Sequence, residues 1–286
     1  MRVRSQAQRI PVVEGFAWAT AALAGRRPRL GPLRAGVAAG RFQHSEWTAL
    51  LGRFVQDGAV DYHNMVRVRR LVEVYLQRLA DTDPETFIDT DDQLAFYLNA
   101  FNAIAIHQVL IAYPLATIRE QPSALLRSYP VGRRNVSLHT LHGNILRAFG
   151  DPRVHLAICN TARGSAAIMP YAYTGATLQT ELDAAVRRFL ADEARGLRWE
   201  AATRTLVVSP ILAWFGGDFA RPYAMPQASN LLVGWADRRR VLQVLMPWLP
   251  PPVQAALSND PRIKVARFDW SLNDRDSRES ARALLA

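Results

Sequence analysis

The only cysteine of this 286-residue chain, Cys159, is the side chain whose chemistry would matter most. A thiol nucleophile needs a base within hydrogen-bond reach, and all six histidines precede Cys159 in the sequence. The mostly apolar residues 154–158 before it predict a short buried strand, and an apolar setting raises the pKa of a thiol. The sequence therefore favours a buried structural cysteine over a nucleophile, and a lone cysteine excludes an internal disulfide.

Two histidines at helical spacing, His139 and His142, could supply half of a zinc site, with His155 or His107 as a further ligand. Nothing in the sequence fixes the other ligands, so we expect no metal and interpret the pair as a helix flank near the surface. We also find no glycine-rich loop that could cradle a phosphate, and therefore predict no cofactor.

Ser165 is a second possible nucleophile, but its surroundings, residues 163–166, lack the Gly-x-Ser-x-Gly turn of serine hydrolases. Asn99 and Asn102 lie within residues 91–113, a segment that is apolar on every face and therefore predicts a helix buried all round. Buried amides need partners, so we expect these two to hydrogen-bond to the polar loop around Asn160 or to the backbone. The residues alone thus indicate the location of a functional site, residues 155–165 beside the two asparagines, but not its reaction.

The helices and strands predicted to position these residues indicate an α+β fold. We expect a mostly helical single domain around a small β-sheet with one buried central helix. Residues 1–43 are expected to form an N-terminal arm, residues 44–275 one domain, and residues 276–286 a tail. Besides the central helix, the apolar spacing predicts further helices, a hairpin over 197–208 and a final strand over 263–267. The further helices are expected over 45–54, 65–79, 137–145, 178–190 and 231–249.

The net charge of +10 is compatible with nucleic-acid binding, but Lys264 is the only lysine and the arginines are scattered. No nucleic-acid-binding module accompanies them, so a basic solvated surface is favoured and nucleic acid is not an expected partner. No apolar run reaches the roughly 20 residues of a membrane-spanning helix.

The location of the protein stays open at the sequence level. Arginines precede the apolar residues 10–24, as in an export signal, whereas Glu14 inside that stretch argues against one. A periplasmic or secreted location and a cytoplasmic one are both compatible with this N-terminus.

Several segments of the chain together match a known pattern: residues 60–62, 94–103, 141–147, 151–157, 170–174, 217–219 and 268–274. The most specific are an asparagine-rich helix, residues 94–103, and a closing Asp-Trp-Ser-Leu-Asn. Together these segments resemble the bacterial branch of a family of unknown function, the DUF547 domain family. They occur in the family's order and cover nearly everything after residue 44. The family is broadly uncharacterised, so the resemblance implies a cleft rather than a reaction. Many bacterial members look exported.

The departures from the family pattern concern its chemistry. After the histidine matched by His155, bacterial members typically read Asn-Cys-Ala-Ser-x-Gly-Cys-Pro-Asn-Leu. Here Asn160 stands at the first cysteine position, Cys159 comes one place early, and Ser165 stands at the second. The family's usual glutamate falls on His142. A cysteine, a histidine and an acid brought together would suggest thiol-hydrolase chemistry, and two of these three are changed in this chain.

The candidate cleft combines both lines of reasoning. Its expected residues are Asn99, Asn102, His142, His155, Asn160 and Ser165. We favour a non-catalytic binding domain that keeps the cleft for a small molecule or peptide and has lost the nucleophile. A hydrolase or transferase acting on a peptide or amide-like substrate is the alternative, and a structural or partner-docking role is the third, so the sequence does not decide whether the protein is an enzyme.

Overall fold

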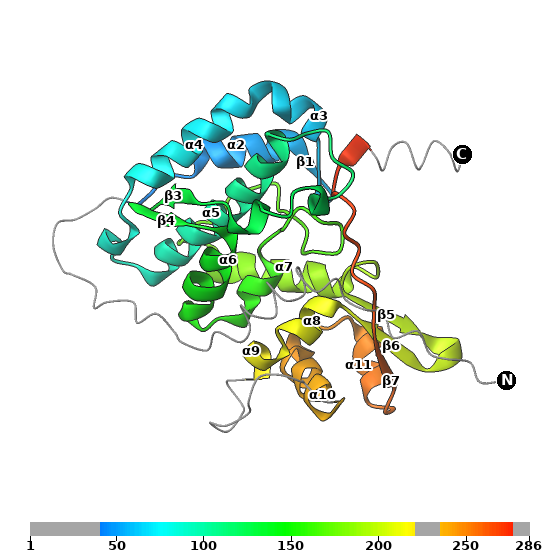
Figure 1. Ribbon diagram of the computed structural model, residues 1–286. Coiled ribbons are helices and arrows are strands. Elements are labelled where there is room, and N and C mark those ends of the chain that lie inside the picture. The colour runs from blue at the N-terminus through cyan, green and yellow to red at the C-terminus, as the bar shows by residue number, and fades with distance from the viewer. Residues whose placement is uncertain (1–40, 221–234, 277–286) are drawn as a thin grey trace.

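The structure is a computed structural model, and it describes residues 41–220 and 235–276 (Figure 1). The helices run over α2 Ser45–Phe54, α3 Tyr62–Met65, α4 Arg69–Asp81, α5 Thr90–Leu110, α6 Leu138–Thr140, α7 Leu178–Ala191, α8 Pro210–Trp214, α9 Gly216–Ala220, α10 Trp235–Val244 and α11 Pro251–Leu257. The strands are β1 Val55–Gln56, β2 Ala59–Val60, β3 Tyr129–Val131, β4 Arg134–Val136, β5 Leu197–Glu200, β6 Thr205–Val208 and β7 Arg262–Val265. The expected arm and tail lie almost entirely outside the described residues, as does the beginning of the helix expected over 231–249.

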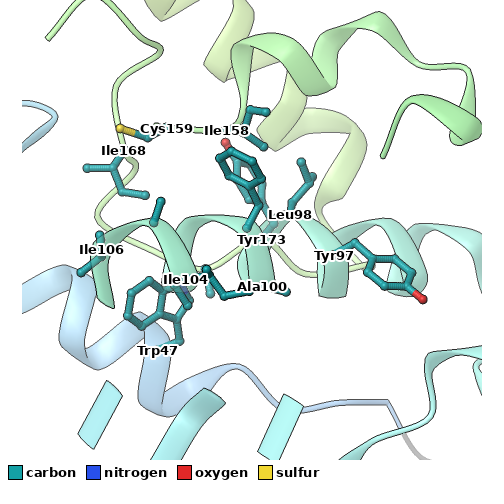
Figure 2. Close-up of a cluster of buried hydrophobic side chains, with 14 of the residues drawn as sticks. Trp47, Tyr97, Leu98, Ala100, Ile104, Ile106, Ile158, Cys159, Ile168 and Tyr173 are labelled. Atoms are coloured by element: carbon teal, nitrogen blue, oxygen red, sulfur yellow. The ribbon is translucent and has the colours of Figure 1, made fainter. Parts of the chain in front are cut away.

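The central helix α5 has a sequence that is apolar all round, and it is buried on all sides. Asp89 caps its first turn by accepting the N–H of Asp91 at 2.8 Å. From Gln93 to Ile106 every residue of the helix is buried. Figure 2 shows side chains of α5, among them Leu98 and Ile104, in one cluster with Trp47. The predicted buried central helix is confirmed.

The short strands form three separate sheets of two, two and three strands. In the largest, β5 and β6 are an antiparallel hairpin, and β7 pairs with β6 in parallel, with Leu206 opposite Ile263. This sheet and helices α8, α10 and α11 lie together at the base of Figure 1, around a second apolar cluster that includes Phe189, Leu206 and Phe215. The predicted α+β class is confirmed, with the strands divided among small sheets.

One element differs from its prediction and carries site residues. Residues 154–158, expected as a strand, belong to a 3-10 helix, Pro152–Leu156, and the turn after it. Asp151 starts this helix by accepting the N–H of Arg153 at 2.9 Å, and Pro152 fits its first position. A short apolar run cannot by itself distinguish a strand from a buried helical turn.

The expected helix over 137–145 begins as predicted, because Ser137 accepts the N–H of Thr140 at 3.1 Å. It then widens into a π-helical turn, Leu141–Ile145, and tightens into a 3-10 turn, Leu146–Phe149. Turns of the π type are rare and often occur at functional sites.

The C-terminal segment joins the distant parts of the fold. After β7 it runs, in red in Figure 1, from the base of the molecule up to α3. On the way it forms isolated bridges that pair Ser271 with Thr117, Leu272 with Ala162, and Asp274 with Val60. It therefore lies against the loop that carries Asn160.

Candidate functional site

Two buried imidazoles form the centre of the site. Nε2 of His142 lies 2.8 Å from Nδ1 of His155, and both side chains are almost inaccessible to solvent. His142 comes from the π-helical turn and His155 from the 3-10 helix that follows it in the chain. The expectation that His142 lies on a helix flank near the surface is therefore wrong, because its ring fills the space between these two turns and the ring of Phe215.

The imidazole pair continues into a buried carboxylate. Nε2 of His155 lies 2.9 Å from Oδ2 of Asp218. Arg147 binds the same carboxylate with two N–H groups, from Nε at 2.6 Å and from Nη2 at 2.9 Å. This is the fork geometry in which a guanidinium binds a carboxylate most strongly. Four side chains thus form one chain of polar contacts from Arg147 to His142.

The protonation of this chain follows from its charges. Burial would raise the pKa of Asp218, but the hydrogen bonds from His155 and Arg147 outweigh it and hold that pKa below its usual range. Burial lowers the pKa of His155 despite the opposing carboxylate, and burial with the neighbouring His155 lowers that of His142 further. At neutral pH both rings are uncharged.

Neutral rings also fix the direction of the hydrogen bonds. The carboxylate of Asp218 only accepts, so Nε2 of His155 donates to it and Nδ1 of His155 carries the lone pair. Nε2 of His142 must then donate to that lone pair, so the lone pair of the His142 ring is on its Nδ1. Phe215 holds this arrangement in place, stacked on His155 at 4.2 Å between ring centroids.

A pocket of about 20 Å³ opens onto the pair. Four of the six predicted cleft residues line it: His142, His155, Asn160 and Ser165. Its other walls are apolar or aromatic, from Ile158, Ile211, Trp214, Phe215 and Phe268. A water molecule needs about 10–15 Å³ of such space, so the pocket holds a water or a methyl-sized group and not a large ligand.

Asn99 and Asn102 do not line this pocket; they hold the main chain around it. Asn102 accepts the N–H of Cys159 at 2.8 Å and donates to the carbonyl of Ala157 at 3.3 Å. Asn99 binds both the N–H and the carbonyl of Tyr173, at 3.0 and 2.8 Å. The predicted hydrogen bonds from buried amides to the backbone are confirmed, and through Asn102 the central helix fixes the chain just before Asn160.

The hydroxyl of Ser165 is occupied by the backbone. Its Oγ donates to the carbonyl of Ala162 at 2.7 Å and lies 3.4 Å from Sγ of Cys159. Because the hydroxyl proton goes to a carbonyl and not to an imidazole, the structure does not activate Ser165 as a nucleophile.

Cys159 belongs to the apolar core. Figure 2 shows it among the apolar side chains that pack around α5, together with Ile158 and Ile168. It is 3% exposed, and burial raises the pKa of its thiol although the hydrogen bond with Ser165 opposes the rise. The expected burial of Cys159 is confirmed, and the raised pKa agrees with the prediction of an unactivated thiol.

Two parts of the site were missed by sequence reasoning. Asp218, the carboxylate partner of His155, lies 63 positions further along the chain. The aromatic wall of Trp214, Phe215 and Phe268 was missed as well. Asp218 and Phe268 do fall within segments that carry the family resemblance, and this was the one signal that pointed to them.

Within 41–220 and 235–276, no group of three or more histidine, cysteine or acidic side chains is arranged to hold a metal ion. In the same ranges, no helix combines the length and the apolar character needed to cross a membrane.

Fold and site together define an α+β domain with a buried histidine pair at a small aromatic-walled pocket. Residues 86–190 match the family model described as "Protein of unknown function, DUF547", which supports the resemblance over the segment that carries α5, both histidines and Ser165. No curated protein and no solved structure matches the chain.

Proposed function

We propose that this protein is a non-catalytic binding domain that takes a small molecule or peptide at the pocket of His142, His155, Asn160 and Ser165. One observation carries the proposal: the two side chains that could attack a substrate are both held by other groups. Cys159 is buried with a raised pKa, and the Ser165 hydroxyl donates to the carbonyl of Ala162.

The other groups that line the pocket suit the recognition of a ligand. The imidazoles of His142 and His155 line it, Asn160 offers an amide, and the walls are apolar and aromatic. Small-molecule sites have this composition, with mostly apolar linings and a few placed polar groups. The small volume favours a ligand that inserts only a small group.

A second candidate is favoured by the chain from Asp218 through His155 to His142. A carboxylate that orients an imidazole is the usual support of a general base. Here the base at the pocket would be His142, and water would be the nucleophile. The reaction would then be hydrolysis of a small amide or ester.

Turnover assays with p-nitrophenyl acetate and with N-acetyl-alanyl-alanine amide separate the two candidates. The binding proposal expects rates equal to those of His155→Gln, whose imidazole is absent, and of His63→Gln, a matched change at an exposed histidine. Turnover by the unmodified protein that falls at least about a hundredfold in His155→Gln and is kept in His63→Gln would establish the hydrolase instead.

A further inference from the structure

A second pocket, of about 30 Å³, shares Asn160 with the histidine pocket. Its lining is mostly apolar, with Leu125, Leu138 and Trp270 among its residues. The polar side chains that line it beside Asn160 are Gln108, Gln121 and Thr161. Neither the sequence nor the family resemblance indicated this pocket.

The two glutamines present acceptors there. Nε2 of Gln108 donates to the carbonyl of Ala124 at 2.7 Å, and Nε2 of Gln121 donates to the carbonyl of Gln108 at 3.1 Å. A carbonyl only accepts, so these bonds fix the orientation of both amides. Within the described residues, the Oε1 atoms of Gln108 and Gln121 are buried and accept no hydrogen bond. Buried acceptors are normally satisfied, so this pocket suits a ligand that brings an N–H.

An aromatic row joins the two pockets. Trp214 and Phe268 line the histidine pocket, and Trp270 lines the second. The ring centroid of Phe268 lies 5.1 Å from that of Trp214 and 4.4 Å from that of Trp270. All three rings are half-buried, and the Arg119 guanidinium lies over the ring of Trp270 at 4.5 Å.

The turn between the pockets is held in a strained conformation. Thr161 has φ of 66°, a left-handed value that is a genuine outlier for a β-branched residue. The C-terminal segment maintains it, because the N–H of Asn273 donates to the carbonyl of Thr161 at 2.8 Å. Such strain persists only where the surroundings impose it, and it clusters at ligand-contacting sites.

Asn160 lines both pockets and can therefore contact a ligand in either one. Its Oδ1 accepts the N–H of Ala162 at 3.1 Å, which orients the side chain. Its own N–H groups make no hydrogen bond within the described part of the chain, so they are donors for a ligand carbonyl. The site as a whole therefore presents a donor between two small, mostly apolar pockets, one of which also presents acceptors.

We infer that the second pocket is a subsite of one extended site, and that its ligand is a peptide with alanine-sized side chains bound across Asn160. Each pocket holds about a methyl group, and a peptide supplies two small side chains with an amide between them. A single acetamido group, as on an N-acetylated sugar, supplies only one methyl. This inference rests on the proposed function and names its ligand class.

Calorimetric titration with N-acetyl-alanyl-alanine amide tests the subsite. Leu125→Phe fills the second pocket, whereas Leu126→Phe makes the same change one residue on, at a side chain that is 65% exposed and does not line the pocket. We expect Leu125→Phe to weaken binding at least about tenfold and Leu126→Phe to leave it within about twofold. The corresponding diphenylalanyl amide is expected not to bind.

Gln121→Leu gives a second test that does not depend on tolerance of a larger side chain. It removes one acceptor together with the donor to the backbone carbonyl of Gln108, and we expect a loss of affinity similar to that of Leu125→Phe. It replaces Leu125→Phe if circular dichroism shows that variant to be misfolded. Equal binding by the Leu125 and Leu126 variants, no binding by the unmodified protein, or preference for N-acetylglucosamine over the dipeptide would each overturn the inference.

The same titrations distinguish this inference from the proposed function. Mass spectrometry of the recovered dipeptide shows whether it has been cleaved. Cleavage that is slowed by Leu125→Phe would refute the non-catalytic role and keep the subsite. Binding without cleavage that is unaffected by Leu125→Phe would keep the binding role and refute the subsite.

Discussion

The imidazoles of His142 and His155 meet at 2.8 Å between Nε2 and Nδ1, inside a protein interior that keeps both rings uncharged at neutral pH. For either ring to become charged it must take up a proton at a buried position, where burial and the Arg147 guanidinium oppose the charge more than the Asp218 carboxylate favours it. The pair therefore links the stability of the domain to pH, and this linkage can be measured separately from any activity.

Acidification should destabilise the protein through this pair. In the unfolded chain a histidine has a pKa of about 6.5, and folding lowers the pKa of both histidines. The unfolded state therefore binds more protons once the pH falls below about 6.5, so the stabilisation present above that pH is lost as the pH drops towards the folded pKa values. Each histidine adds a slope of up to about 1.4 kcal/mol per pH unit.

The variant His142→Gln isolates this effect from other buried histidines, such as His44, whose pKa is lowered by burial to about 4. Urea unfolding between about pH 7.5 and pH 5.5 should show a shallower pH dependence in His142→Gln than in the unmodified protein. Equal slopes in the two proteins would mean that His142 titrates alike when folded and unfolded.

Replacing Asn102 with leucine should destabilise the fold. Leucine has a similar size but leaves the buried N–H of Cys159 without a partner, whereas the carbonyl of Ala157 keeps the hydroxyl of Tyr173 at 3.3 Å. Each buried group left without a partner lowers the free energy of unfolding by about 1–3 kcal/mol. Asn99→Leu should also destabilise the fold, because Asn99 binds the N–H and the carbonyl of Tyr173. Urea unfolding measures both. The exposed Asn135 is the control, and Asn135→Leu should change stability by less than about 0.5 kcal/mol.

Cys159 should react slowly with iodoacetamide at neutral pH while the protein is folded. The thiolate is the reactive form, and burial both raises the thiol pKa and blocks the reagent. Cys159→Ser should cost some stability, because a hydroxyl replaces sulfur in the apolar core, and should leave ligand binding intact. Rapid alkylation with an apparent pKa well below about 8.5 would restore the thiol-enzyme hypothesis.

Residues 44–275 should unfold in one cooperative transition. Deleting residues 1–40 should leave thermal unfolding nearly unchanged, whereas ending the chain before Phe268 should abolish folding. The structure gives the reason, because the last segment bridges Val60, Thr117 and Ala162, and Tyr62 donates to Asn273 at 2.8 Å. Differential scanning calorimetry of the intact protein would contradict this with two separate peaks.

The sequence by itself determined the elements whose signals are local. A run that is apolar on every face predicted α5, and the rule that buried amides need partners predicted the backbone bonds of Asn99 and Asn102. The apolar residues before Cys159 correctly predicted its burial, although they form a 3-10 helix and not a strand. Burial depends on apolar content, whereas the choice between strand and helical turn depended on the cap at Asp151.

Only the tertiary structure decided which polar groups meet. His142 and His155 lie 13 positions apart and Asp218 another 63 beyond, and no spacing rule relates positions so distant on three different turns. The second pocket likewise brings Gln108 and Trp270 together from α5 and the C-terminal segment. Contacts of this kind arise because packing a whole core brings remote turns side by side, and a local sequence pattern carries no information about that packing.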